Sequence, residues 1–90
     1  MVCGCLIANW RVLEPGVPGR LGVVTSRQIG KAVVRNRARR LLREVYRLNR
    51  ISMMKPVDLV LVARKSIATS SFLEVRRDFL RALRNAGLAA

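Results

Sequence analysis

The spacing of apolar residues along the chain predicts two amphipathic helices. In residues 31–50 the apolar side chains recur every three or four positions, as Val34, Ala38, Leu41, Val45 and Leu48, with Leu42 beside them. In residues 71–87 they recur in the same way, as Phe72, Val75, Phe79, Leu83 and Ala86. Each spacing gives one apolar stripe along a helix. Ser71 and Glu74 form a capping box for the second helix, and Gly87 is placed to end it.

Three other apolar runs predict β-strands. Residues 2–13 are largely apolar, and residues 21–26 are rich in β-branched side chains. Two Pro-Gly pairs lie between these runs and predict a hairpin loop, so the two strands should be antiparallel. Residues 58–64 form a continuous apolar run, which is typical of a strand covered on both faces. The order β-β-α-β-α predicts a single α+β domain over residues 1–90, with the helices packed on a small sheet.

The composition is strongly basic. The chain contains 18 Lys and Arg residues against five Asp and Glu, a formal net charge of +13 in 90 residues. Such an excess indicates a polyanionic partner. The hydrophobic fraction of 51% indicates a folded domain rather than a disordered basic tail. Aromatic residues make up only 4% of the chain, so contacts to phosphates should contribute more to binding than stacking on bases.

The basic residues gather on one side of the first predicted helix. At about 100° per residue, the side opposite the apolar stripe carries Arg35, Arg39, Arg40, Arg43, Arg47 and Arg50, with Asn36 and Tyr46 among them. Arg37 lies at the edge of the stripe and can reach toward the loop. Glu44 is the only acid there and is placed to pair with Arg40.

This distribution favours a phosphate-binding surface over a face that is simply solvated. Like charges four residues apart on a helix each cost about 0.2–0.5 kcal/mol, and a solvated face usually mixes both signs. The planar guanidinium of arginine can hold a phosphate at two points and can also stack on a base. Gly30, which permits a close backbone approach, and Lys31, at the helix N-terminus, extend the surface. The sequence therefore predicts a nucleic-acid partner.

The titratable residues provide no credible active site. The chain has no histidine, and its acids are Glu14, Glu44, Asp58, Glu74 and Asp78. Glu74 and Asp78 each have an arginine three positions later, which predicts a solvated ion-pair face. The serines and cysteines lack a base to activate them. Cys3 and Cys5 are too close for an unstrained disulfide and too few for a zinc site, so we expect two reduced, partly buried thiols and no metal or cofactor in the protein itself.

Two further observations bear on the class of protein. A DNA-binding helix-turn-helix would need a first helix in residues 21–25, LGVVT, but this run is β-branched and has few helix formers. The apolar start of the chain is about half a membrane span and lacks the basic region that opens a signal peptide. We therefore expect a cytoplasmic protein with no membrane contact.

Residues 21–49, LGVVTSRQIGKAVVRNRARRLLREVYRLN, resemble the signature of the protein subunit of bacterial ribonuclease P. The centre of that signature is an Arg-Asn-Arg motif, here Arg35-Asn36-Arg37. The run DLVLVARKSIA, which starts at residue 58, and the capped C-terminal helix are similar to the family as well, so the resemblance covers residues 20–87. It implies a two-layer α/β sandwich with a small mixed sheet and a left-handed βαβ crossover, as in some ribosomal-protein domains. Sequence rules alone would favour a right-handed connection.

The resemblance also implies a function. The chain would be the RNA-binding subunit of an endonuclease, a hydrolase that removes the 5′ leader from precursor tRNA, and its partners would be the catalytic RNA and the precursor. In this family the RNA and its Mg²⁺ ions perform the hydrolysis, which fits the missing active site. The alternative is a ribosomal-type structural RNA-binding protein without a processing role, since the same basic sandwich would serve it.

By carry-over from the family, one set of residues should face the catalytic RNA near the cleavage site: Arg27, Lys31, Arg35, Asn36, Arg37, Arg39 and Arg40. Arg43 and Arg47 are added as members of the helix face. The cleft for the leader would lie between the sheet face and this helix, and Val24 and Ser26 could border it.

The chain departs from the family pattern at its front. The family has a further helix, with a leader-contacting aromatic residue, before the first strand. Here Met1 opens almost directly on strand-like sequence, so we expect that helix to be missing. Trp10 could replace the aromatic contact, or it could be a hydrophobic anchor under the sheet.

Overall fold

The computed structural model describes residues 1–90. Its strands are β1 (Val2–Cys3), β2 (Leu6–Val12), β3 (Arg20–Val24) and β4 (Val57–Ala63). Its helices are α1 (Ala32–Asn49) and α2 (Phe72–Asn85), and the short 3₁₀ turns are η1 (Arg27–Ile29), η2 (Arg50–Ser52) and η3 (Lys65–Thr69). Apart from the two-residue strand β1, this is the predicted order β-β-α-β-α.

The strands form one mixed sheet in the order β1-β2-β4-β3. β4 pairs antiparallel with β2 and parallel with β3. The predicted antiparallel direction of β2 and β3 is therefore confirmed, but the predicted hairpin between them is wrong, because β4 lies between the two strands. A central place suits β4, since all the backbone groups of such a buried strand need partners on its two edges.

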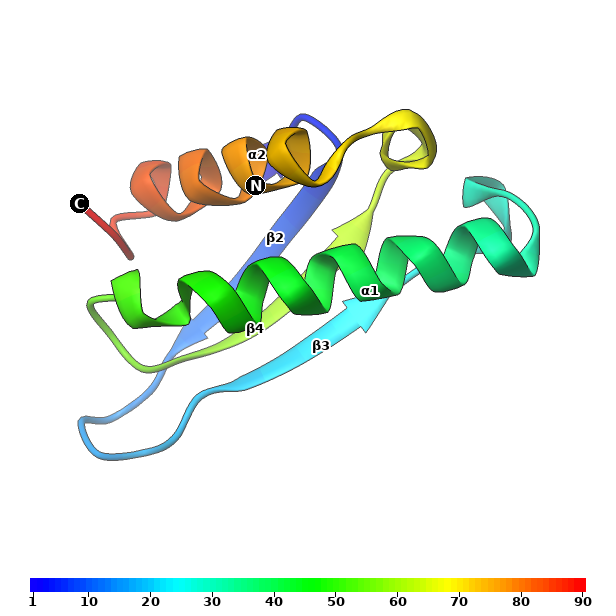
Figure 1. The fold of residues 1–90 in the computed structure, drawn as a ribbon. Coiled ribbons are helices and arrows are strands. Elements are labelled where there is room, and N and C mark those ends of the chain that lie inside the picture. Colours follow the sequence, from blue (N-terminus) through cyan, green and yellow to red (C-terminus); the bar gives the residue numbers. More distant parts are fainter.

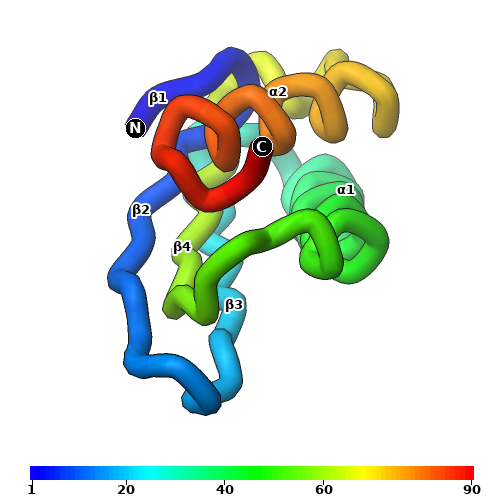
Figure 2. The backbone as a smooth tube through the Cα atoms, turned by 90° about the vertical axis from the view of Figure 1, so that its left-hand side faces the viewer, coloured from blue at the N-terminus to red at the C-terminus, as the bar shows by residue number.

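Both helices pack on the same side of the sheet, so the domain has two layers (Figure 1). α1 lies against β3 and β4, while α2 lies against β1 and β2 (Figure 2). Seen with the helices toward the reader and with β3 and β4 pointing up, β4 lies to the left of β3 (Figure 1). The connection from β3 through α1 to β4 is therefore left-handed, as the resemblance implied.

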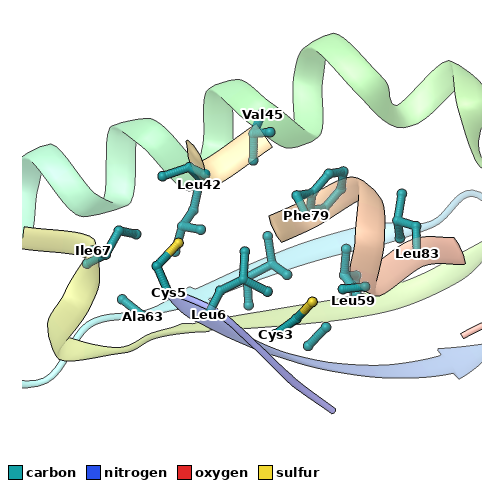
Figure 3. Packing of buried hydrophobic residues seen from close by; sticks show 14 of the residues in the cluster. Cys3, Cys5, Leu6, Leu42, Val45, Leu59, Ala63, Ile67, Phe79 and Leu83 are labelled. Atoms are coloured by element: carbon teal, nitrogen blue, oxygen red, sulfur yellow. The ribbon is translucent and has the colours of Figure 1, made fainter. Parts of the chain in front are cut away.

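The hydrophobic core lies between the sheet and the two helices. Leu42 and Val45 from α1 meet Phe79 and Leu83 from α2 above the sheet (Figure 3). Alternate residues of β4 point into this core, whereas Val60, on the other face, is 38% exposed. The prediction that this strand is covered on both faces is wrong, because a short apolar run does not reveal how many layers surround it.

The buried stripe of α1 differs from the predicted one at its C-terminal end. Ala38, Leu42, Val45 and Asn49 are buried, with Leu42 inside the stripe rather than beside it. Leu48 is 49% exposed, so its predicted place in the stripe is wrong. Asn49 takes that place because its Nδ2 donates to the carbonyl of Val45 at 2.8 Å, which satisfies the buried amide.

α2 begins and ends where the sequence predicts. The hydroxyl of Ser71 accepts from the N–H of Glu74 at 3.2 Å, and the carboxylate of Glu74 accepts from the N–H of Ser71 at 3.0 Å. The helix stops at Asn85, just before Gly87. Within its predicted inner face, the buried residues are Val75, Phe79 and Leu83, and the half-buried ones are Phe72 and Ala86.

The front of the chain is a small hairpin. A tight turn at Gly4 and Cys5 folds β1 back on β2, with Val2 opposite Ile7. The prediction of one strand over residues 2–13 is therefore wrong. The backbone of Gly4 has a φ of +58°, a conformation that glycine adopts at little cost, and this allows the chain to reverse after only two residues of strand.

Asp78 holds this turn against α2. Its side chain is only 3% exposed and accepts a hydrogen bond from the N–H of Cys5 at 3.0 Å. Arg77 and Arg81 also donate to it. Burial opposes the ionisation of Asp78 and by itself would raise the pKa of the carboxyl. The hydrogen bonds, of which the one from Cys5 has the largest effect, outweigh burial and hold this pKa below its usual value. The predicted pair of Asp78 with Arg81, three residues later, is therefore confirmed, but the prediction of a solvated face is wrong, because Asp78 is buried. Glu74 serves the helix cap instead of pairing with Arg77.

Both cysteines are free thiols and contribute to the core. Burial, together with the neighbouring carboxylate of Asp78, raises the pKa of the Cys5 thiol to about 11. Arg81 donates from Nε to the sulfur of Cys3 at 3.0 Å. Cys5 therefore stays protonated at neutral pH and acts as a small apolar residue.

Asp58 links three strands on the open face of the sheet, and this makes stability sensitive to acid. Its carboxylate in β4 accepts from Arg11 of β2 at 2.9 Å and from Arg20 of β3 at 3.0 Å. The hydrogen bond from Arg20 is the largest influence on the pKa of Asp58, and the one from Arg11 adds to it. Together they lower this pKa to about 2, although desolvation of the carboxyl partly opposes them. A carboxyl whose pKa is lower in the folded state adds stability above its unfolded value, and that stability is lost as the pH falls through the folded value.

We therefore expect the free energy of unfolding to decrease between pH 4 and about pH 2. Urea unfolding followed by circular dichroism across this range measures the slope. Asp58→Asn should flatten part of it, whereas Glu14→Gln, at a carboxylate without an ion pair, should leave it unchanged. An equal slope for wild type and Asp58→Asn would contradict this assignment.

Candidate nucleic-acid interface

The outer side of α1 and the turn before it form one continuous basic surface, which we call the arginine face. Its members are the residues predicted from the sequence: Arg27, Lys31, Arg35, Asn36, Arg37, Arg39, Arg40, Arg43 and Arg47. Most are exposed, while Arg35 and Arg39 are half-buried along one flank of the helix. The structure thus gathers all of them on one element and its approach, because Ala38, Leu42 and Val45 turn the opposite side of α1 into the core.

The turn before α1 positions the first two of these residues. Arg27 lies in η1, and Gly30 then leads into the helix with a φ of +145°. A side chain at Gly30 would come within 3.3 Å of Val34, so the glycine lets the chain pass close to the first turn of the helix. The predicted close approach of its backbone to a phosphate stays a prediction. Lys31 is the N-cap residue, and no side chain caps the first turn of the helix. The helix therefore begins with free backbone N–H groups and a cationic N-cap residue, an arrangement that favours an anion.

Glu44 neutralises a different arginine from the predicted one. Its carboxylate accepts two hydrogen bonds from the guanidinium of Arg47, three residues later, at 2.5 and 3.2 Å. Hydrogen bonding from Arg47 lowers the pKa of Glu44. The predicted pair with Arg40 is wrong, because the planar fork of Arg47 offers two parallel bonds to the same carboxylate. Arg40 is left without a partner.

Two other members of the face are held by neutral groups. Arg37 donates to the carbonyl of Ser70 at 2.8 Å, in the loop before α2. Arg39 donates to the side-chain carbonyl of Asn36 at 2.8 Å. Each bond fixes the direction of a guanidinium but leaves its charge uncompensated.

The remaining cations of the arginine face make no ion pair and no side-chain hydrogen bond within the protein; they are Arg27, Lys31, Arg35, Arg40 and Arg43. The Nε of Arg35 is buried and has no partner. These cations repel one another, because they are held on one side of the helix and have few acidic partners. An anion that lies along the helix would relieve the repulsion, so the arginine face favours the binding of such an anion.

Two aromatic residues, Tyr46 and Trp10, are partly buried and pack against the core. Tyr46, predicted on the polar side of α1, packs at the edge of the core. Trp10 also packs against the core, on the same face of β2 as Leu6 and Ala8. That face is covered by the helices, so the structure favours the interpretation of Trp10 as an anchor under the sheet.

Val24 and Ser26 lie at the exposed end of β3. Val24 is opposite Val62 of β4, on the open face of the sheet. Ser26 lines a shallow cavity of about 370 Å³ together with Ile7 and Val62. These positions border the open sheet face, on the side of the sheet away from Trp10.

The sequence analysis missed one part of the surface. A second cavity, of about 620 Å³, opens within the arginine face and has Phe72 of α2 in its lining. The helical spacing assigned Phe72 to the core alone. The signal that could have revealed it is its place directly after the N-cap Ser71, at the end of a buried stripe, where a side chain is covered on one side only.

Residues 20–24 form the strand β3, so the rejection of a DNA-binding helix-turn-helix is confirmed. The protein contains no helix with the length and hydrophobicity needed to cross a bilayer. No group of three or more His, Cys, Asp or Glu residues comes together in a way that could hold a metal ion.

The sequence is similar to a known protein family and to several of its members. A family model described as Ribonuclease P matches residues 5–87. A ribonuclease P protein component from Desulfovibrio desulfuricans is 46% identical over 72 residues, which cover 78% of this chain and 55% of that protein. One from Thermus aquaticus is 42% identical over 74 residues, which cover 82% of this chain and 44% of that protein. The chain thus spans about half the length of the curated relatives it matches.

Solved structures agree with this assignment. The ribonuclease P protein from Thermotoga maritima superposes with a TM-score of 0.81 at 29% identity, over 94% of this chain and 80% of that one. The Staphylococcus aureus protein superposes with a TM-score of 0.85 over 100% of this chain and 82% of that one, and at 20% identity it shows the shared fold. With the family match over residues 5–87, these likenesses show that the chain belongs to the ribonuclease P protein family.

Proposed function

We propose that this chain is the RNA-binding subunit of a ribonuclease P ribonucleoprotein and assists its catalytic RNA in removing the 5′ leader from precursor tRNA in the cytoplasm. The observation that carries the proposal is the arginine face, an ordered row of cations of which only Arg47 has an acidic partner. Such a surface suits the closely spaced phosphates of a folded RNA. The family match favours this function over that of a ribosomal-type structural protein.

Four of the five acids serve structure rather than hydrolysis, and the fifth, Glu14, lies in the loop between β2 and β3, outside the arginine face. Asp58 and Asp78 are held in ion pairs, Glu74 caps α2, and Glu44 pairs with Arg47. None of them lies in the arginine face free to act as a general base. We therefore assign the hydrolysis to the RNA subunit and to Mg²⁺ ions bound with that RNA, and we assign to the protein the binding of RNA and the screening of its phosphates.

The arginine face can help catalysis without a catalytic group. Folding of the RNA and docking of precursor tRNA bring phosphates close together, and this repulsion grows as Mg²⁺ is removed. Cations held on a rigid helix reduce the repulsion at a fixed place, since their positions are set by the core on the other side of α1.

Reconstitution tests the proposal. The protein is added to a bacterial ribonuclease P RNA at low Mg²⁺, and removal of the leader from precursor tRNA is followed by gel electrophoresis. We expect an increase in rate of about tenfold or more, equal to ~1.4 kcal/mol of barrier. At high Mg²⁺ the RNA alone should approach the same rate, because the ions then screen the same phosphates. No increase over RNA alone at low Mg²⁺ would overturn the proposed function.

A further inference from the structure

The cavity of about 620 Å³ in the arginine face lies between the outer side of α1 and the start of α2. Its lining consists of Arg37, Arg40, Leu41, Arg43, Glu44, Arg47 and Phe72. The two helices run beside each other at this place, so the cavity joins residues that are far apart in the sequence (Figures 1 and 2). Here an aromatic ring, that of Phe72, lies among the cations of the arginine face.

The floor of the cavity is apolar. Leu41 and Phe72 are both half-buried and pack against the edge of the core. Phe72 is the first residue of α2, and the capping box of Ser71 and Glu74 fixes the backbone on which it stands. The ring is therefore held in place on one side by the core while the other side borders the cavity.

The rim of the cavity carries four arginines, and two of them are held in place by other groups of the protein. Arg37 is fixed by the carbonyl of Ser70, and Arg47 is fixed by Glu44. Arg40 and Arg43 have no partner and can turn toward a ligand. The charges therefore suit phosphates at the rim, but a bare phosphate would gain nothing from the apolar floor.

We propose that this cavity binds one unpaired nucleobase of the RNA partner, with the base on Phe72 and Leu41 and the flanking phosphates on Arg40 and Arg43. The proposal rests on the proposed function and adds a base contact to it. An aromatic floor with arginines around it is the combination that single-stranded nucleic acids use, because every base has a face that can stack and a phosphate on each side. The volume lies within the range of sites that enclose a small ligand.

Variants at Phe72 test the base contact. Phe72→Leu keeps an apolar side chain against the core but removes the ring, whereas Phe72→Tyr keeps the ring. Leu73→Ala is the matched control, since the neighbouring Leu73 is 72% exposed and does not line the cavity. Circular dichroism first checks that each variant is folded. Affinity is then measured by filter binding to bacterial ribonuclease P RNA.

We expect Phe72→Leu to weaken RNA binding by about 5- to 100-fold, while Phe72→Tyr stays within about twofold of wild type and Leu73→Ala binds like wild type. The dependence of affinity on salt should not change in Phe72→Leu, because no phosphate contact is lost. Chemical probing of the RNA should show an unpaired base that wild type and Leu73→Ala protect and Phe72→Leu does not.

A folded Phe72→Leu variant that binds the RNA as tightly as wild type, with the same bases protected, would overturn the base contact. That result leaves the proposed function intact, since the wild-type protein would still bind and assist the RNA. Failure of the proposed function is a different result, in which the wild-type protein itself neither binds the RNA nor increases leader removal.

Discussion

Raising the salt concentration from 50 to 200 mM should weaken the binding of ribonuclease P RNA to this protein by about 10²- to 10³-fold. The unpaired cations of the arginine face should make about five phosphate contacts, and each such contact releases counterions from the RNA when it forms. Since that release is opposed by added salt, affinity should fall as a power of the salt concentration. Filter binding over a series of salt concentrations measures the slope.

The variant Arg40→Ala, Arg43→Ala sharpens this test. Both side chains are exposed and lie outside the core, so the fold should persist. The loss of two contacts should lower the salt slope by about two units, and the same change in salt should then weaken binding only about 20- to 40-fold. Binding that does not respond to salt, or an equal slope in the variant, would contradict phosphate contact through α1.

The double variant should also be at least as stable as wild type. Arg43 lies four residues from both Arg39 and Arg47, and like charges at this spacing destabilise a helix. Alanine removes the repulsion and favours the helix. A basic face that weakens its own fold is therefore expected to be retained for binding.

Gly4→Ala should destabilise the domain by about 2–5 kcal/mol. Gly4 has a φ of +58°, and a Cβ at this position would overlap the carboxylate of Asp78. The carboxylate cannot move away without losing the hydrogen bond that it accepts from the N–H of Cys5. That N–H group would then be buried without a partner. The substitution thus combines a strained backbone with a broken buried contact, and unfolding in urea measures the loss.

Gly16→Ala is the matched control. Gly16 also has a positive φ, +87°, but no atom lies within 4 Å of the position of its Cβ. Only the backbone cost remains, about 1 kcal/mol. If Gly4→Ala were no more destabilising than Gly16→Ala, Asp78 would not be the group that fixes the N-terminal turn.

Much of the architecture could be predicted because local patterns specify it. The helical spacing gave the position of α1 and α2, and the capping box of Ser71 and Glu74 gave the first residue of α2. The same spacing placed the arginines on the solvent side of α1. These features depend on residues a few positions apart, where the geometry of one helix is enough to relate them.

What could not be predicted depends on contacts between distant segments. No local pattern shows that β4 lies between β2 and β3, or that Asp78 accepts from Cys5, 73 residues before it. The front of the chain is largely apolar, which predicts a single strand, and only the contact with α2 explains its turn. Phe72 is similar: the spacing shows that it faces inward, but its place in a cavity of arginines depends on α1.

The roles of the arginine face and of the RNA can be separated in one measurement. Leader removal from precursor tRNA is followed at low Mg²⁺ with rising concentrations of wild-type protein or of Arg40→Ala, Arg43→Ala. If the protein binds and the RNA cuts, the variant will need a higher concentration to act but will reach the same maximal rate constant. A variant that saturates at the wild-type concentration, yet with a much lower rate constant, would show that these side chains take part in the chemical step, and it would contradict the account.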